Sequence, residues 1–263
     1  MRIDQLLVQR GQAASRSQAA RLVAAGVAWR VGATGPWRTA AKAGDDVPDT
    51  AELQLADDSE SRYVSRGGLK LAGALAASGV TVSGTLCLDV GQSTGGFTDC
   101  LLQAGAAHVV GVDVGHAQLH PRIRGDARVT CVEKCNAREL STDVLIAANA
   151  IPASAGCQKS LKFDRVVGDL SFISLTLVLP ALVPLLAAGG DLLMLVKPQF
   201  ELQPQDIGKG GLVRDPAAYA RVEARLRTAC AALGLAVVGW FDSPITGGDG
   251  NREFFIHARH GRA

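Results

Sequence analysis

Residues 85–97 read TLCLDVGQSTGGF, and this stretch decides the fold of most of the chain. A short apolar run ends in glycines, as a buried strand does where it turns into a helix, which we expect over residues 96–104. More strand-like runs follow, namely HVVGVDVG, VTCVEKC, FDRVVGDL, DLLMLVKP, LAVVGWF and EFFIHAR, and further helices are expected over residues 175–187 and 216–233. This alternation predicts a doubly wound α/β domain with a mostly parallel, seven-stranded sheet whose last two strands pair as a hairpin.

The composition fits a folded protein with room for a second, small domain. The chain has 263 residues, of which 48% are hydrophobic and 20% charged, enough to bury a full core. The six cysteines form no CxxC pair, and Cys131 and Cys135 have no second pair of zinc spacing beside them, so we expect neither a disulfide framework nor a metal site. The longest apolar stretch, 175–188, contains two prolines and falls short of the ~20 residues that span a bilayer. With no signal peptide either, we expect a cytoplasmic protein without stable membrane association.

Charge is unevenly distributed near the N-terminus. Residues 1–44 hold seven basic side chains and one acidic one, whereas residues 45–60 hold seven acids and no base. Helical spacing predicts one short helix that ends at Gly11 and another that runs from an N-cap at Ser17 to Gly26, with strands in VAWRVG and AELQL. A small α+β module with a positive surface suits the phosphates of folded RNA, but an ordinary solvated surface has the same composition.

The order RIDQLLVQRGQAASRSQAARLVAAGVAWRVG resembles the S4 domain, an RNA-binding fold of ribosomal proteins and pseudouridine synthases. The resemblance covers residues 2–58 and implies an S4-type domain at 1–60, joined by a linker at 61–66 to a second domain at 67–263. One departure is Arg30, because the family usually ends this pattern in VxVNG, with a polar amide in place of the cation. We expect RNA contacts from the arginines of this region, namely Arg2, Arg10, Arg16, Arg21 and Arg66.

The turn after the first strand of the second domain has features of a nucleoside site. It lacks the GxGxxG spacing of dinucleotide enzymes, and Asp113 ends the next strand, where a carboxylate can accept hydrogen bonds from both hydroxyls of a ribose. NAD would want the same acid, but Asp89 directly at the strand end would repel a pyrophosphate and suits a sulfonium and ammonium ligand. We therefore expect S-adenosylmethionine, bound by residues at the ends of strands: Asp89, Gly91, Ser93, Thr94, Gly95, Gly96, Phe97, Asp113, Val114, Asn136 and Asp169.

Polar residues also follow the later strands, at the same edge of the sheet. Asp169 ends VVGDL and Lys197 ends LLMLVKP. Glu253 opens EFFIHA and reaches this edge if its strand runs antiparallel, while Lys70 begins a helix ahead of the sheet. A lysine against an apolar strand, beside a second ammonium group, tends to lose its proton and can act as general base toward a ribose 2′-hydroxyl. For each residue alone, an ordinary strand-end ion pair is an equal explanation.

Motifs along the second domain resemble the TlyA family, whose members are described both as haemolysins and as ribosomal RNA 2′-O-methyltransferases. They are SRGGLKL, LDVGQSTGGFTDCLL, DVGHAQLHPRIR, NARELS, DLSFISLTLVLP, LVKPQFE, GKGGLVRD and SPITGGDGNREFF. The resemblance implies a Rossmann-like class I methyltransferase domain of the FtsJ type, with Lys197 as its central base. The full K-D-K-E catalytic set carried over from that type is Lys70, Asp169, Lys197 and Glu253. It further implies that a monomer methylates cytidine riboses in the rRNA of assembled ribosomal subunits.

Departures and alternatives remain. Gln92 stands where the family more often has a small residue, so we expect it to tune cofactor affinity, and residues 147–159 read as an added loop. A pore-forming haemolysin and a non-catalytic ribosome-binding protein are the alternative functions; the first lacks a membrane span, and the intact lysine and carboxylate set opposes the second. Base methylation would need an NPPY or catalytic cysteine motif near residue 169, where the chain reads DLSF.

Overall fold

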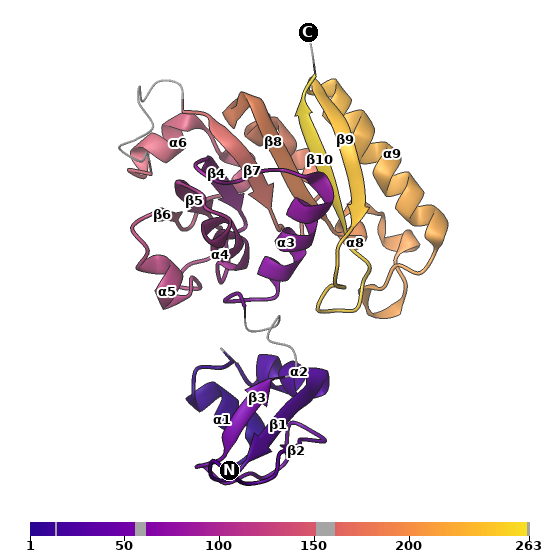
Figure 1. Ribbon diagram of the computed structural model, residues 1–263. Coiled ribbons are helices and arrows are strands. Elements are labelled where there is room, and N and C mark those ends of the chain that lie inside the picture. The colour runs from indigo at the N-terminus through magenta and orange to yellow at the C-terminus, as the bar shows by residue number, and fades with distance from the viewer. Residues whose placement is uncertain (14, 56–61, 151–160, 262–263) are drawn as a thin grey trace. The chain divides into compact units, whose positions relative to one another are not determined.

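The computed structural model describes residues 1–13, 15–55, 62–150 and 161–261. The chain forms two compact units, Met1–Leu69 and Lys70–Ala263, and Figure 1 shows the elements of each. The boundary falls shortly after the expected linker at 61–66, within α3 (Gly67–Ser78). Most of the expected added loop at 147–159 lies outside the described residues.

The N-terminal unit combines two helices with a small antiparallel sheet of order β2-β1-β3. Its elements are α1 (Ile3–Gln9), α2 (Arg16–Gly26), β1 (Val27–Arg30), β2 (Arg38–Thr39) and β3 (Glu52–Leu55). Apolar residues at helical spacing, among them Ile3, Leu7 and Leu22, are fully buried together with Val27. The small α+β arrangement expected from the sequence is therefore present.

The second helix begins earlier than the sequence suggested. Its N-cap is Ser15, whose hydroxyl accepts a hydrogen bond from the backbone N–H of Gln18 at 3.2 Å. The expectation of a cap at Ser17 was wrong, because that residue already lies in the first helical turn. Both serines are good capping residues, and only the extended backbone at Ser15 distinguishes the cap.

The second unit has a seven-stranded sheet of order β6-β5-β4-β7-β8-β10-β9. Its strands are β4 (Leu86–Val90), β5 (His108–Val112), β6 (Val129–Val132), β7 (Phe163–Gly168), β8 (Leu186–Val196), β9 (Leu235–Asp242) and β10 (Phe254–His260). Strands β4 to β8 pair in parallel, and β10 runs antiparallel to both of its neighbours. The expected sheet, including its terminal hairpin, is confirmed.

Helices cover both faces of this sheet (Figure 1). They include α4 (Gly96–Gln103), α5 (Pro121–Arg124), α6 (Thr142–Ala147), α7 (Leu179–Leu182), α8 (Pro198–Glu201) and α9 (Pro216–Ala232). On one face, α9 residues such as Leu226 share a buried cluster with Leu88 and Ile256 of the strands. On the other, Phe97 of α4 stacks on Phe255, whose side chain alternates with that of Ile256. Burial on both faces explains why the strands read as nearly continuous apolar runs.

The helix expected over residues 175–187 is broken. The segment forms a 3-10 turn at Leu175–Leu177, the short helix α7 and a second 3-10 turn at Val183–Leu185. Pro180 and Pro184 are each the second residue of one of these pieces, and proline has no N–H to continue the bonds of a preceding turn. Strand β8 consequently starts at Leu186, earlier than the apolar run DLLMLV suggested.

The strand order reverses at β4, which pairs with β5 on one side and with β7 on the other. In a doubly wound sheet the crossover connections then leave on opposite sides, and a crevice opens at the carboxyl ends of these strands. The fold therefore places the turns after β4, β5 and β7 around one common space.

Candidate active site

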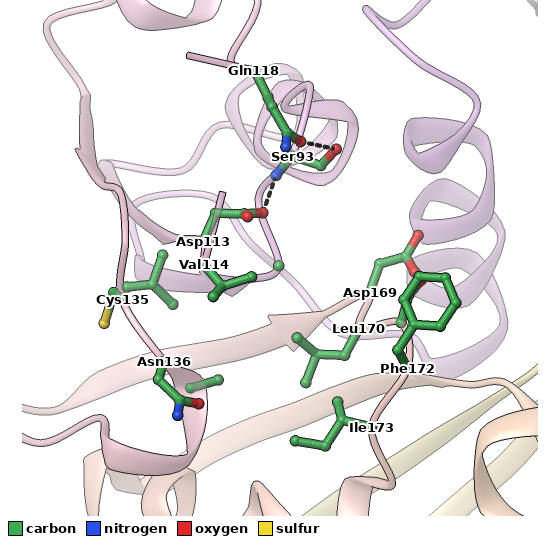
Figure 2. A pocket seen from close by; sticks show the side chains of 14 residues that line it. Ser93, Asp113, Val114, Gln118, Cys135, Asn136, Asp169, Leu170, Phe172 and Ile173 are labelled. Atoms are coloured by element: carbon green, nitrogen blue, oxygen red, sulfur yellow. Dashed lines mark hydrogen bonds between the residues drawn. The ribbon is translucent and has the colours of Figure 1, made fainter. Parts of the chain in front are cut away.

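A cavity of about 470 Å³ lies at this crevice. Figure 2 shows Asp113 and Val114 facing Asp169, Leu170 and Phe172 across it. Its lining comes from the turns after four strands: Gly91, Ser93, Val112, Asp113, Val114, Gln118, Cys135, Asn136, Ala137, Asp169, Leu170, Ser171, Phe172 and Ile173. This volume falls within the range of small-molecule and cofactor sites, roughly 300–1,000 Å³.

The cavity brings together six of the residues expected to bind a cofactor: Gly91, Ser93, Asp113, Val114, Asn136 and Asp169. The others expected there, Asp89, Thr94, Gly95, Gly96 and Phe97, are not among its lining residues. Sequence reasoning missed Val112, Gln118, Cys135, Ala137 and the run of residues 170–173. That run follows Asp169 directly, so its position after a strand could have signalled it, whereas nothing local marks Gln118.

Glycine is required at position 91 by a close approach of two turns. Gly91 has a φ of 85°, a conformation that L side chains rarely adopt. A Cβ atom there would lie 2.5 Å from the backbone oxygen of Asp169. The backbone N–H groups of Gly91 and Gln92 both donate to the carbonyl of Val112, at 2.9 and 3.1 Å. The turns after β4, β5 and β7 are thus locked together beneath the cavity.

The Asp113 carboxylate is held in place by backbone groups. One oxygen accepts a hydrogen bond from the N–H of Ser93 and the other from the N–H of Gly115, each at 2.7 Å. Ser93 in turn donates its hydroxyl to Gln118 at 3.2 Å (Figure 2). Each carboxylate oxygen can accept more than one hydrogen bond, so the two backbone N–H groups orient Asp113 and leave further acceptor sites open. It keeps acceptor capacity for two hydroxyls of a ligand.

Asp89 lies below the cavity rather than in it. Its carboxylate is fully buried and accepts the Thr98 hydroxyl at 2.6 Å, while the Thr98 oxygen accepts the Gln92 amide at 2.9 Å. Burial above all, with the negative charge of Asp169 adding to it, raises the pKa of Asp89 to about 7. Asp89 is fully buried and does not line the cavity, so its expected contact with the cofactor stays a prediction.

Gln92 is also turned inward, with 3% of its surface exposed. Its side-chain amide occupies the space above Gly111, where an added Cβ would lie 2.0 Å from it. Gln92 is not among the residues that line the cavity, and the expectation that it tunes cofactor affinity stays a prediction. Any influence on the cavity passes through Thr98 and the loop backbone.

The four expected catalytic residues form two ion pairs. Lys197 Nζ lies 2.5 Å from Asp169 Oδ1 and donates a hydrogen bond to the Ser171 hydroxyl at 2.8 Å. Lys70 Nζ lies 2.6 Å from Glu253 Oε2. The second pair is the more deeply buried, since the Lys70 and Glu253 side chains are 9% and 2% exposed. Asp169 and Ser171 line the cavity, so the first pair is the one that faces it.

The two ion pairs act on each other electrostatically. Burial raises the pKa of Glu253, the charges of Lys70 and Lys197 oppose this rise, and Asp169 adds to it. The expectation that Glu253 reaches this edge through an antiparallel strand is confirmed, because Phe254 of β10 pairs with Val196 of β8. That register places Glu253 beside the residue that follows β8, which is Lys197.

Three of the arginines expected to bind RNA make contacts within the N-terminal unit. Arg2 and Arg16 both donate to the buried Asp4 carboxylate, at 2.9 to 3.2 Å, and hydrogen bonding from Arg2 is the main cause of the lowered pKa of Asp4. Arg10 donates to the carbonyls of Ala51 and Asp49 at 2.5 and 2.6 Å. These contacts join α1 to α2 and to the segment before β3. Arg21 lies half-buried on α2, and Arg66 precedes α3.

The described residues give little support to a metal site, a reactive cysteine or a membrane span. Among them, no group of three or more histidine, cysteine, aspartate and glutamate side chains could hold a metal ion. Cys131 and Cys135 are free cysteines, and burial raises the pKa of both thiols. None of the described helices has the length and apolar character needed to cross a membrane.

Comparison with known proteins agrees with this geometry. The family profile of FtsJ-like methyltransferase matches residues 63–260, which include all four residues of the two ion pairs. The chain belongs to the FtsJ-like methyltransferase family. Its S-adenosylmethionine cofactor and its α/β architecture, both expected from the sequence, are those of this family.

Relatives of this FtsJ-like chain carry two kinds of name. It is 44% identical, over 98% of its length and 89% of the relative, to the 16S/23S rRNA (cytidine-2'-O)-methyltransferase TlyA of Mycobacterium tuberculosis. It is also 34% identical to Hemolysin A of Brachyspira hyodysenteriae, over 98% of this chain and 99% of that protein. A solved structure from Streptococcus thermophilus, described as a hemolysin, covers 100% of this chain and 89% of its own, with a TM-score of 0.73 and 38% identity.

Proposed function

We propose that this protein uses S-adenosylmethionine to methylate the ribose 2′-hydroxyl of cytidine in ribosomal RNA. The observation that carries the proposal is the Lys197–Asp169 ion pair at the cavity, with the Lys70–Glu253 pair behind it. A ribose hydroxyl is a poor nucleophile until its proton is removed, and an amine held at the mouth of a cofactor cavity can remove it. The cytidine and ribosomal RNA are taken from the name of the TlyA relative.

The residues of the cavity fit the cofactor. Gly91 lines the cavity, and because it has no side chain, its backbone can come close to a bound nucleoside. Asp113 presents a fixed carboxylate with free acceptor capacity to the ribose of that nucleoside. When bound, S-adenosylmethionine supplies an electrophilic methyl group. Gly91, Ser93, Asp113, Val114, Asn136 and Asp169, all of which line the cavity, would hold it.

Lys197 has the position of the general base. Its ammonium is held by the Asp169 carboxylate and the Ser171 hydroxyl, and these two contacts fix the direction of the nitrogen. To accept a proton from the 2′-hydroxyl, the nitrogen must first be uncharged. The Lys197 side chain is 12% exposed, so substrate can approach it with little intervening water.

Lys70 and Glu253 are positioning residues in this mechanism. Their ion pair is nearly inaccessible to solvent, so a substrate hydroxyl meets Lys197 first. Glu253 keeps Lys70 in place, and the positive charge of Lys70 acts on the Lys197–Asp169 pair. Charges of fixed position in a dry site act more strongly than the same charges in water.

The N-terminal unit is proposed to hold the ribosomal RNA outside the catalytic domain, as an S4-type module. The exposed parts of the Arg2 and Arg16 side chains, 44% and 57% of each, leave both guanidinium groups able to reach phosphates despite their contact with Asp4. Ribosomal subunits as substrate imply action in the cytoplasm, and we propose that the protein acts there as a monomer.

The test is transfer of a tritiated methyl group to ribosomal subunits purified from a strain that lacks the enzyme. Wild-type protein should label a subunit, and Lys197→Ala should not. Lys162→Ala is the matched control, because Lys162 is an exposed lysine at the opposite end of β7 that bonds only to the Pro184 carbonyl in the described residues. Equal labelling by wild type and Lys197→Ala would contradict the proposed base, and no labelling of any subunit would contradict the proposed substrate.

A further inference from the structure

The β1–β2 hairpin of the N-terminal unit concentrates aromatic and cationic side chains on an exposed surface. Residues 27–39 read VAWRVGATGPWRT, with two tryptophans, two arginines and no acidic residue. Trp37 is 42% exposed and Val31 is 49% exposed. Exposed apolar side chains that lie close together mark interaction surfaces, and tryptophan is enriched at such surfaces. Nothing in the proposed mechanism uses this hairpin.

Arg30 and Trp37 form a fixed stack. The Arg30 guanidinium carbon lies 4.6 Å from the Trp37 ring centroid. The same guanidinium donates two hydrogen bonds, at 2.8 and 2.6 Å, to Glu52, which lies directly opposite Arg30 on β3. The ion pair therefore holds the planar group that supports the indole. An asparagine, the residue that the S4 resemblance leads one to expect at position 30, has neither the charge nor the length to do this.

The opposite face of the hairpin carries a second aromatic and cationic pair. Trp29 and Arg38 are directly opposite in the β1–β2 register, and the Arg38 guanidinium lies 5.4 Å from the Trp29 ring centroid. A small cavity of about 180 Å³ adjoins them, lined by Trp29, Val31, Pro36, Arg38 and Pro48. This space is lined by one indole ring, two prolines, one valine and one guanidinium, and it suits a flat, apolar group with a negative charge attached.

We infer that this hairpin is a binding site for a run of unpaired nucleotides of RNA, with Trp37 as the stacking side chain on one face and Arg38 as the phosphate contact on the other. Unstacked bases bind to aromatic rings and guanidinium planes, and this stacking tolerates any base sequence. The absence of acids from residues 27–39 suits a polyanion and disfavours basic protein segments. The inference rests on the proposed function, because that function makes RNA the substrate of this protein.

The test compares full-length variants in their binding to a fluorescein-labelled single-stranded RNA hexamer and to a hairpin RNA with every base paired. Trp37→Ala should weaken hexamer binding about tenfold and leave the paired RNA almost unaffected, whereas Trp37→Phe should retain most of the hexamer affinity. Arg30→Asn should give an intermediate loss, because it removes the support of the indole. Val238→Ala is the control for an exposed apolar side chain of the other unit, since Val238 is 54% exposed.

Methyl transfer separates this inference from the proposed function. In transfer to ribosomal subunits, Trp37→Ala should raise the KM for the subunit several-fold and leave kcat unchanged, because Trp37 belongs to the other compact unit from Lys197. Unchanged hexamer affinity in both Trp37→Ala and Arg30→Asn would overturn the hairpin site even if wild-type protein methylates the subunit. If wild type labels no subunit, the proposed function fails, and the hexamer comparison still decides whether the hairpin binds unpaired RNA.

Discussion

Buried carboxylates occur in two regions of the same sheet, and the two regions differ in the cations and hydrogen-bond donors that surround them. Asp191 of β8, near the amino end of β7, is 3% exposed and meets Arg165 at 3.3 Å, His257 at 2.7 Å and Arg259. Burial alone would raise its pKa, but hydrogen bonds from His257 and Arg259 outweigh burial and the pKa of Asp191 is lowered. Asp89, at the carboxyl end of β4, is fully buried and accepts hydrogen bonds from the hydroxyl and the backbone N–H of Thr98, which are uncharged donors, and its pKa is raised to about 7.

The difference separates stability from function. The cations around Asp191 compensate its charge, as expected of a cluster that joins β7, β8 and β10. At the carboxyl ends, burial raises the pKa of Asp89 and of Glu253, and their charges stay incompletely compensated. Groups with raised or lowered pKa values at a cavity are typical of catalytic sites, where stability is given up for reactivity.

The largest expected effect is at the carboxyl end. Lys197→Arg keeps the positive charge beside Asp169, but a guanidinium does not lose its proton in proteins and cannot act as general base. The kcat for methyl transfer should fall roughly 10³-fold, while the free energy of unfolding in urea stays close to that of wild type. A variant with near-normal kcat would show that the charge of Lys197, rather than its basicity, is what matters.

The reverse result is expected at the Asp191 cluster. Asp191→Ala leaves Arg165 and His257 without their carboxylate, so we expect unfolding to be easier by about 3 kcal/mol. The kcat of the folded enzyme should be unchanged. Arg259→Ala is the matched control, and because that side chain is 51% exposed it should cost less than about 1 kcal/mol. Loss of kcat without loss of stability in Asp191→Ala would contradict the conclusion that the Asp191 cluster serves stability rather than catalysis.

The two aspartates should also give opposite responses of stability to pH. Asp191 has a lowered pKa in the folded protein, so its contribution is present above the unfolded value and is lost as pH falls through the folded value. Asp89 has a raised pKa of about 7, so the folded state prefers its protonated form and the contribution of Asp89 falls as pH rises toward 7. Urea unfolding of Asp89→Asn and wild type at pH 5 and pH 8 checks this. The variant should gain stability relative to wild type at the higher pH, and an equal difference at both pH values would contradict the raised pKa.

The smallest effect is expected at Ser171. Its hydroxyl accepts one hydrogen bond from Lys197, and a single net hydrogen bond is worth about 1 kcal/mol, or roughly fivefold in rate. Ser171→Ala should lower kcat by this factor without changing the KM for S-adenosylmethionine. Ser78→Ala controls for the substitution itself, because it removes a hydroxyl that donates to Leu75 in α3 and accepts from the backbone N–H of Val80 just after it. Full activity in Ser171→Ala would mean that Asp169 alone orients the lysine.

Residues at the ends of apolar strands were predictable from the sequence. Asp113, Asp169 and Lys197 each follow a strand, and the carboxyl ends of parallel strands meet at one edge. The inward turn of Asp89 and Gln92 was not predictable, because it depends on the space above Gly111 and on the packing of Thr98. Neither the hydrophobic periodicity nor the spacing of residues in the sequence shows which way these two side chains turn.

The N-terminal unit shows the same limit for charged residues. Counting arginines indicated a basic surface, but the count does not reveal that Arg2 and Arg16 share the buried Asp4. That contact forms only when α1 and α2 pack together. The stack of Arg30 on Trp37 likewise depends on the pairing of β1 with β3, although the departure of Arg30 from the S4 pattern pointed to that position.

The most direct test of ribose methylation is the identity of the modified nucleoside. Ribosomal subunits from a strain lacking the enzyme would be treated with the protein and S-adenosylmethionine. Their RNA would then be digested to nucleosides, which would be separated and identified by mass spectrometry. The account predicts newly formed 2′-O-methylcytidine with wild type and none with Lys197→Ala. A cytidine methylated on its base, or 2′-O-methylcytidine formed equally by both proteins, would contradict it.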